Sequence, residues 1–196
     1  MSIKEVICIM LAYLLGGICT GFYLVRFKEN IDIRDHGSGG VGARNVGRIL
    51  GRSGCILTMF GDGAKGFVAI FLAQRFLVSE EALGVVLVAV IAGHIWPLPL
   101  QFRGGRGIAT SVGAFLAFDY TIVLLLLGLI VVLMVFRRGL TISGLVAFLL
   151  LPMVAYALEW PGHTVAALAA VSVIILFAHR ERIRKAFAEA LPQKEA

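Results

Sequence analysis

Seven apolar segments separated by short polar stretches dominate the sequence. The first covers residues 6–25 without a charge, and the others cover residues 53–77, 82–96, 107–118, 120–136, 140–158 and 164–178. A helix needs roughly 20 apolar residues, and at least about 17, to cross a bilayer. The pattern therefore predicts about seven membrane-spanning helices. Residues 107–118 are short and Asp119 follows them, so residues 107–136 form either two helices or one bent helix.

The composition agrees with a membrane protein. The 196 residues are 59% hydrophobic and 15% charged, and the mean hydropathy is +0.93. These values lie outside the range of ordinary soluble domains. We predict an all-α, polytopic integral membrane protein that forms a single domain over residues 1–196. Three cysteines without CxxC spacing indicate neither a disulfide framework nor a zinc site, and no metal or other cofactor is expected.

The charged residues indicate how the spans are oriented. If all seven segments cross the membrane, the loops on one side receive 15 of the 18 Lys and Arg residues, and the other side is mainly acidic. Basic loops face the cytoplasm, so we predict an outside N-terminus and a cytoplasmic C-terminus. Merging residues 107–136 into one span would move the later basic loops to the wrong side. The basic side receives Arg26, Lys28, Arg34, Arg44, Arg48, Arg52, Arg103, Arg106, Arg137, Arg138, Arg180, Arg182, Arg184, Lys185 and Lys194.

The polar stretch between the first two apolar segments, residues 36–48, contains five glycines and two arginines. Glycines let backbone N–H groups converge on a ligand, and guanidinium groups suit phosphate oxygens. An anion-binding loop is favoured over a flexible linker. Residues 37–42 match GxGxxG, but a membrane span precedes them instead of a strand, so a dinucleotide site is excluded. The candidate ligands are Ser38, Gly39, Gly40, Gly42, Arg44, Asn45 and Arg48.

Asp62 and Lys65 lie three residues apart inside the second apolar segment, on one helical face. A charge at membrane depth costs roughly 2.5 to 3.5 kcal/mol on insertion scales, so such residues pair or face a polar cavity. Structural pairing and direct contact with a ligand are equally favoured for these two side chains. Both interpretations can hold, and in either case the pair shapes the predicted pocket.

A third polar unit follows residues 82–96. His94 ends that segment, and Gly104, Gly105 and Arg106 precede a predicted helix start. Free N–H groups at a helix N-terminus beside an arginine make an anion site. A single histidine at a span end is more often a hydrogen-bonded interface residue than a base. Because no nucleophile carries a local base motif, catalysis is expected to rest on positioning and charge. Other polar groups predicted at this face are Thr110, Thr141, Ser143, His179 and Arg182.

Three motifs, taken in this order, resemble those of the bacterial acyl-phosphate:glycerol-3-phosphate acyltransferase family. They are SGGVGARNVGR at 38–48, GDGAKG at 61–66, and GHIWP with FRGGRGIAT within 93–110. The resemblance covers nearly the whole chain, including the seven segments and the His-Arg-Glu near its end. It implies acyl transfer from acyl phosphate to the 1-hydroxyl of glycerol 3-phosphate. The products would be lysophosphatidate and phosphate, in the first step of phospholipid biosynthesis.

The resemblance also implies roles for particular residues. Catalytic roles fall on Ser38, Asn45, His94 and Arg106, and pocket shaping falls on Asp62 and Lys65. Phosphate binding falls on Gly39, Gly40, Gly42, Arg44, Arg48, Gly104, Gly105, Thr110, Thr141 and His179. The family usually has Asn, Thr, Lys and Asn where this chain has Gly40, Arg44, Arg106 and Arg182. These departures bear on the choice of acyl donor and acceptor, because an arginine fork binds anions differently from a lysine point charge.

The predicted enzyme is a monomer in the inner membrane of a bacterial cell, with its site facing the cytoplasm. Its expected partners are acyl phosphate, glycerol 3-phosphate and membrane lipids. No nucleic acid is expected, because membrane topology accounts for the net charge of +6. Two alternatives are an anion or phosphate-ester carrier and a related acyltransferase with another donor or acceptor. A carrier needs polar positions across the whole bilayer, whereas here only Asp62 and Lys65 lie outside the predicted cytoplasmic half.

Overall fold

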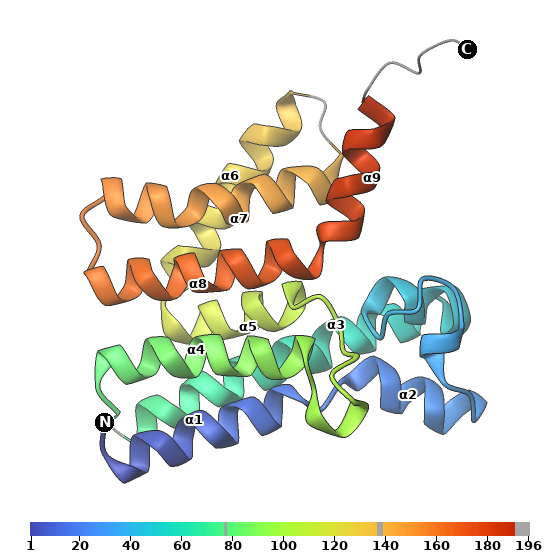
Figure 1. Cartoon of the computed structure of the whole chain (residues 1–196), viewed down its shortest axis with the longest axis horizontal. Helices are drawn as coiled ribbons and strands as arrows, with labels where there is room; N and C mark the ends of the chain where they lie inside the picture. The colour runs from blue at the N-terminus through green and yellow to red at the C-terminus, as the bar shows by residue number, and fades with distance from the viewer. Residues whose placement is uncertain (77, 137–138, 191–196) are drawn as a thin grey trace.

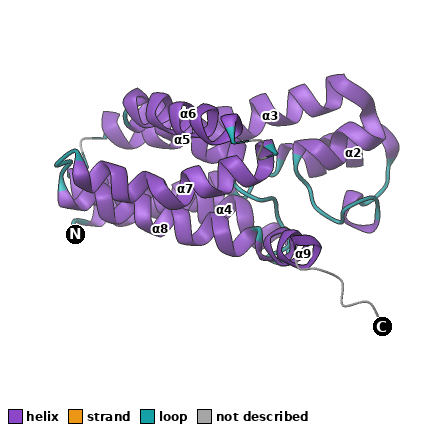
Figure 2. Ribbon diagram, turned by 90° about the horizontal axis from the view of Figure 1, so that it is seen from above, coloured by secondary structure: helices purple, strands orange, loops and turns teal. Residues whose placement is uncertain are grey.

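All regular structure is helical in the residues that the computed structural model describes, which are 1–76, 78–136 and 139–190. This confirms the all-α prediction for the described part of the chain. Figures 1 and 2 show the helices packed side by side in a bundle. In chain order they are α1 (Ile3–Gly16), α2 (Thr20–Glu29), η1 (Ile33–Asp35), α3 (Ala43–Arg75), α4 (Glu80–Ile95), η2 (Leu98–Leu100), α5 (Ile108–Phe118), α6 (Tyr120–Val135), α7 (Leu140–Ala157), α8 (Gly162–Ala178) and α9 (Arg180–Ala190).

Several of these helices suit a bilayer. Within the described ranges, four stretches are long and apolar enough to cross one: Ile3–Glu29, Ala43–Arg75, Glu80–Leu100 and Leu140–Ala157. Helices α5, α6 and α8 are apolar but shorter. Seven crossings therefore remain a prediction. The extended backbone of Asp119 separates α5 from α6, and its carboxylate accepts a hydrogen bond from Thr121 N at 2.8 Å. The two-helix interpretation of residues 107–136 is confirmed.

The uncharged sequence of the first apolar segment suggests one continuous helix, but the structure has two. Helix α1 ends at Gly16, and α2 begins at Thr20 after a break. Gly16 packs so closely on α4 that an added Cβ would collide with the Val90 carbonyl oxygen. Two adjacent glycines, Gly16 and Gly17, weaken helix propagation at this point. Inside a membrane such a break survives only if other groups satisfy the freed backbone, and α3 supplies them as described below.

Helix α3 begins at residue 43, well before the apolar segment predicted from residue 53. The three side chains Arg44, Asn45 and Arg48 therefore stand on helical turns, although the sequence suggested a loop through residue 48. The helix kinks at Gly51, where φ is 69° and ψ is −164°. Such a backbone is open to glycine and strained for other residues. The kink separates the arginine-bearing turns from the apolar part of α3.

Close helix packing fixes the middle of the bundle. Helices α3 and α5 touch where an added Cβ on Gly113 would collide with the Gly63 carbonyl. Small residues let helix backbones approach in this way. Fully buried Phe115 and Phe148 fill the space between α5 and α7. Many outer side chains are apolar and exposed, such as Leu124 at 61%, which suits contact with lipid.

Acidic and basic loops lie at opposite ends of the bundle (Figure 1). At one end, Glu5 accepts a hydrogen bond from Ser79 N at 3.2 Å, and His163 lies 3.3 Å from Glu80. At the other end are the α2–α3 loop, the α4–α5 loop and α9. This separation agrees with the predicted grouping of charges. Which end faces the cytoplasm remains a prediction, and Arg137, Arg138 and Lys194 lie outside the described residues.

Candidate active site

Asn45 organises the loop before α3. Its side chain is 2% exposed, and its amide group bonds to the loop on both sides. An added Cβ on Gly37, where φ is 61°, would collide with Asn45 Oδ1. Asn45 therefore holds the loop in shape, and its catalytic role remains a prediction. Oδ1 accepts from Ser38 N at 2.9 Å and Arg48 Nη1 at 3.4 Å, and Nδ2 donates to the carbonyls of His36 and Gly40 at 2.9 Å and of Ile33 at 3.3 Å.

The N-terminus of α3 is available to an anion. Its N-cap residue, Gly42, makes no side-chain capping bond, so the first N–H groups of the helix lack a side-chain acceptor. The Ser38 side chain is exposed beside it. A Cβ added at Gly42 would meet no atom within 4 Å. A Cβ added at Gly40 would meet only Ser38 Oγ, at 3.9 Å. Sterics therefore do not require glycine at these two positions, and their predicted phosphate contacts stay predictions.

Four arginines from α3, the loop before α5, and α9 lie at this end of the bundle, and we call Arg44, Arg48, Arg106 and Arg182 the arginine cluster. Arg44 Nη1 donates to Thr141 Oγ1 at 2.8 Å, which ties α3 to α7 across 97 residues. Burial lowers the pKa of Arg106, and the charge of Arg182 lowers it further. Burial likewise lowers the pKa of Arg182, with added repulsion from Arg44 and Arg48. The four charges are thus close enough to repel one another.

The arginine cluster has no acidic partner within the described ranges. The arginine ion pair found there joins Arg34 to Asp32 at 2.6 Å, outside the cluster. That bond also lowers the pKa of Asp32. Guanidinium groups held together without carboxylates create a positive potential that a phosphate neutralises with paired hydrogen bonds. The cluster is therefore the feature of the site most directly suited to an anion.

The N-terminus of α5 is a second polar element of this end of the bundle, and we call it and the N-terminus of α3 with its preceding loop the two walls of the site. Its N-cap, Gly107, has φ of 83° and makes no side-chain capping bond. Thr110 Oγ1 and Ser111 Oγ are buried just inside the helix and have no hydrogen-bond partner. Buried hydroxyl groups rarely lack partners, so both are candidate ligand groups. The sequence reasoning missed Ser111, because a single serine in an apolar helix gives no signal of a site.

His179 stands beside this wall. An added Cβ on Gly107 would lie 2.6 Å from Ile175 Cδ1, and the Ile175 carbonyl lies 2.8 Å from His179 Nδ1. Burial lowers the pKa of His179, the bond to Ile175 opposes this, and the charges of Arg106 and Arg182 lower the pKa further. The role of His179 as a site residue remains a prediction.

Asp62, Lys65 and His94 form a buried network between the two walls. Lys65 Nζ lies 2.8 Å from the Ile18 carbonyl, 2.8 Å from His94 Nδ1 and 3.0 Å from Asp62 Oδ1. Asp62 Oδ1 also accepts from Thr20 N at 3.2 Å. Structural pairing, one of the two interpretations of Asp62 and Lys65, is thus present. Their contact with a ligand stays a prediction, as does a catalytic role for His94.

The glycines before Arg106 form a turn against α4. Gly104 N donates to the Ile95 carbonyl at 3.1 Å, and Gly105 N donates to the His94 carbonyl at 3.0 Å. An added Cβ on Gly105 would collide with the His94 ring. These glycines place Arg106 by close packing on α4. Whether their backbone also contacts phosphate stays a prediction.

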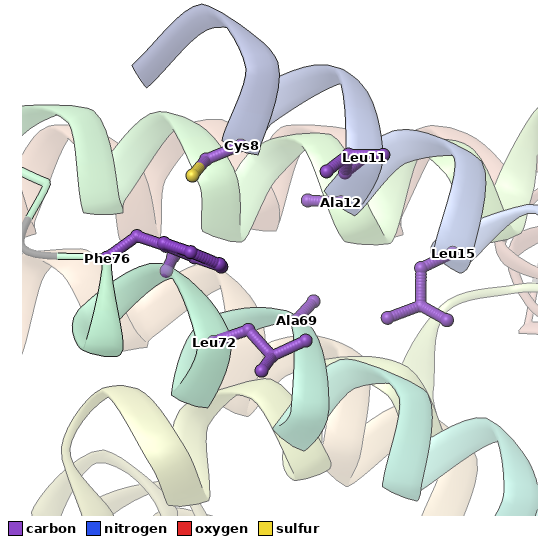
Figure 3. A pocket seen from close by; sticks show the side chains of 8 residues that line it. Cys8, Leu11, Ala12, Leu15, Ala69, Leu72 and Phe76 are labelled. Atoms are coloured by element: carbon purple, nitrogen blue, oxygen red, sulfur yellow. The ribbon is translucent and has the colours of Figure 1, made fainter. Parts of the chain in front are cut away.

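Two cavities elsewhere lack the charges of an anion site. An apolar groove of about 60 Å³ lies between α1 and α3, lined by residues such as Leu15, Ala69 and Phe76 (Figure 3). A second cavity, of about 390 Å³, lies at the acidic end and includes Glu80 and Asp119, which repel phosphate. No three His, Cys, Asp or Glu side chains gather as a metal site in the described residues.

Comparison with known proteins gives one consistent result. Residues 6–189 match the family described as glycerol-3-phosphate acyltransferase. The chain is 41% identical over 181 residues to glycerol-3-phosphate acyltransferase 1 of Desulfitobacterium hafniense (strain Y51), covering 92% of this chain and 90% of that one. It is 37% identical over 170 residues to glycerol-3-phosphate acyltransferase 1 of Bacillus cereus, covering 87% and 93% of the two chains.

Two crystal structures are similar over most of the chain. Both are of PlsY (YgiH), an integral membrane glycerol 3-phosphate acyltransferase. The glycerol 3-phosphate form aligns with a TM-score of 0.85 and 27% identity, covering 95% of this chain and 93% of that one. The lysophosphatidic acid form aligns with a TM-score of 0.82 and 26% identity, with the same coverage.

Proposed function

This chain belongs to the glycerol-3-phosphate acyltransferase family, and from that premise we propose that it transfers an acyl group from acyl phosphate to the 1-hydroxyl of glycerol 3-phosphate. The products are lysophosphatidate and inorganic phosphate. The observation that supports this most is the arginine cluster, which has no carboxylate partner in the described part of the chain and includes arginines from the start of α3 and from just before α5, two helices whose N-caps make no side-chain hydrogen bond.

The charge of the cluster suits two phosphoryl groups. A phosphate ester carries about −1.5 to −2 at neutral pH, so two of them bring roughly −3 to −4. Arg44, Arg48, Arg106 and Arg182 bring four positive charges. One glycerol 3-phosphate would leave about half of that charge uncompensated. The balance supports simultaneous binding of glycerol 3-phosphate and acyl phosphate.

The chemistry needs no protein base. The acceptor hydroxyl oxygen attacks the acyl carbonyl carbon, the ester bond forms, and the bond between that carbon and the phosphate oxygen breaks. The leaving phosphate keeps the electron pair of the broken bond and takes the hydroxyl proton. Arginines and helix N–H groups aimed at the phosphates stabilise the charge that develops on the leaving group. Asn45 and the turn at Gly104 and Gly105 keep these donors in place.

We further propose how the enzyme lies in its membrane. The protein is a single domain that crosses the bacterial inner membrane seven times as a monomer, with its N-terminus outside. The arginine cluster then faces the cytoplasm, where both phosphate groups are accessible. The gathering of basic loops at one end of the bundle supports this orientation. The acyl chain lies among the apolar helices.

The test is acyl transfer by purified protein in detergent. Palmitoyl phosphate and labelled glycerol 3-phosphate should yield labelled lysophosphatidate, and palmitoyl-CoA should not replace the donor. Arg106→Gln should lower kcat/KM at least 100-fold. The matched control is Arg75→Gln, an exposed arginine at the other end of α3, which should leave kcat/KM within twofold. If only palmitoyl-CoA supports activity, the proposed acyl-phosphate donor is wrong. If neither donor yields lysophosphatidate, the proposed reaction is wrong.

A further inference from the structure

Lys65 ties three segments of the chain at one buried point. Its ammonium group has two hydrogen-bond contacts of 2.8 Å, with the Ile18 carbonyl and His94 Nδ1, and an ion pair of 3.0 Å with Asp62 Oδ1. The side chain is 6% exposed, so solvent does not compete for these bonds. The acceptors belong to the α1–α2 break, to α3 and to α4. The ammonium is therefore held by groups of the protein from three segments.

The pair of Asp62 and Lys65 completes the broken helix. At the break, the Ile18 carbonyl accepts from Lys65, and the first N–H group of α2, on Thr20, donates to Asp62 at 3.2 Å. An unsatisfied backbone group in the apolar part of a bilayer costs several kcal/mol, so the ion pair stabilises the break where water cannot. The direction in which α2 leaves α1 consequently depends on this pair.

That direction sets the position of the first wall of the site. Helix α2 packs on the loop before α3 so closely that an added Cβ on Gly21 would collide with the Val41 carbonyl and lie 2.7 Å from Val46 Cγ2. Val41 belongs to the loop that Asn45 closes, and Val46 belongs to the first turns of α3. A shift of α2 would therefore move the loop and the turns that carry Arg44 and Arg48.

His94 connects the same ammonium to the second wall. An ammonium only donates, so His94 Nδ1 must accept and its ring hydrogen must lie on Nε2. The ring packs against Gly105, and the His94 carbonyl accepts from Gly105 N at 3.0 Å. Arg106 is the next residue and precedes the N-terminus of α5. Lys65 thus fixes the ring on which the Arg106 turn rests.

We propose that Lys65, together with Asp62 and His94, is a positioning residue for acyl transfer. The Lys65 ammonium holds the α1–α2 break and the Nε2–H form of His94, and so keeps the two walls of the arginine cluster at the separation that acyl transfer needs. This inference rests on the proposed function. Lys65 and Asp62 need no contact with substrate to fulfil this role.

The kinetic test compares Lys65→Met with the double variant Asp62→Asn/Lys65→Met. The single variant leaves the Asp62 charge buried without its partner and is expected to lower the melting temperature most. The double variant removes both charges at similar volume, so a folded protein remains for kinetics if the single variant fails to fold. We expect the double variant to lose at least 50-fold in kcat/KM, with a higher KM for glycerol 3-phosphate. A loss below threefold would overturn the proposal.

The control separates positioning from loss of stability. Ser172→Ala removes a buried hydrogen bond to the Phe148 carbonyl, which joins α8 to α7 and lies apart from the cluster. It should lower the melting temperature without changing kcat or KM of the folded protein. If Ser172→Ala and the double variant show the same loss of kcat/KM for each degree of melting temperature lost, Lys65 acts only through stability and the proposal is wrong.

A spectroscopic test does not depend on activity. Nitrogen-15 spectra of labelled histidine, with His94→Gln to assign the signal, should show His94 protonated on Nε2 in the unaltered protein. The double variant removes the donor to Nδ1, so the His94 signals should move toward a mixture of the two neutral forms. Protonation on Nδ1 in the unaltered protein would overturn the inference. If the unaltered protein instead transfers no acyl group, the proposed function fails, and the spectra still decide the network.

Discussion

The role of Asn45 gives the sharpest test of the site. Asn45→Asp keeps the shape of the side chain but replaces the Nδ2 donor by a carboxylate oxygen. Two hydrogen bonds of 2.9 Å and one contact of 3.3 Å to loop carbonyls then become contacts between oxygens. The new carboxylate also draws on Arg48, which already lies 3.4 Å from Oδ1. The loop should open, and the cluster should lose part of the charge that it offers to substrate.

The expected loss can be worked from these contacts. A neutral hydrogen bond contributes about 0.5–1.5 kcal/mol, and a buried acceptor left unpaired costs about 1–3 kcal/mol. Two lost bonds and one unpaired carbonyl amount to about 3 kcal/mol. If the loop must close for the reaction, this raises the barrier from free enzyme and substrate by the same amount. Each 1.36 kcal/mol is a factor of ten, so kcat/KM should fall roughly 100-fold.

The assay is lysophosphatidate formation at saturating palmitoyl phosphate with varied glycerol 3-phosphate. Asn30→Asp is the matched control, because it makes the same chemical change on an exposed side chain that ends α2 in the left-handed region, with φ of 54°. The control should stay within twofold of the unaltered protein. An Asn45→Asp enzyme that keeps more than a third of the original kcat/KM would refute the organising role of Asn45.

Three further outcomes follow from the structure. Gly105→Ala should lower the melting temperature and should lower kcat/KM more than tenfold, because the new methyl group collides with the His94 ring. In the control Gly128→Ala, the new methyl group meets no atom within 4 Å, so neither quantity should change. Arg44→Thr should raise KM for glycerol 3-phosphate several-fold and flatten the dependence of KM on salt between 50 and 500 mM, because one cluster charge is lost. The lowered pKa of His179 means that the unfolded chain binds a proton more tightly than the folded chain. The free energy of unfolding should therefore fall as pH drops below about 6.5, by at most about 1.4 kcal/mol per pH unit, and His179→Gln should reduce this slope.

Much of the fold follows from the sequence because hydropathy acts locally. Each helix from α4 to α8 begins and ends within two residues of the bounds of a predicted apolar segment. Turn residues and charges end each helix where the apolar segment ends. The break in the first segment is different. Its sequence is uncharged and apolar throughout. The side chains that bond to the free backbone groups at the break, Asp62 and Lys65, come more than 40 residues later. A local hydropathy pattern cannot show that a side chain distant in the sequence will form a hydrogen bond with a backbone group.

The same limit applies to the site. Glycines, arginines and helix starts mark the two walls of the proposed anion site, because these residue types suit phosphate chemistry wherever they occur. The contact between Arg44 and Thr141 spans 97 residues, and only the packing of α7 against the other helices creates it. Ser111 is conspicuous only once its hydroxyl is seen to be buried without a partner. Such features depend on which groups remain unsatisfied after folding, and a sequence pattern does not contain that information.

The contrast between two polar networks explains how one bundle serves both structure and function. Around Lys65, two hydrogen bonds and an ion pair hold the ammonium to groups of the protein. The four cations of the arginine cluster form no ion pair with a carboxylate among the described residues, and the N-caps of α3 and α5 make no side-chain hydrogen bond. Buried polar groups stabilise a fold only when they are paired, so we infer that the first network fixes geometry and propose the second as the anion site. In the two proposals taken together, the Lys65 network positions the arginine cluster, and an anion with several acceptor oxygens is the partner that we propose for the cluster.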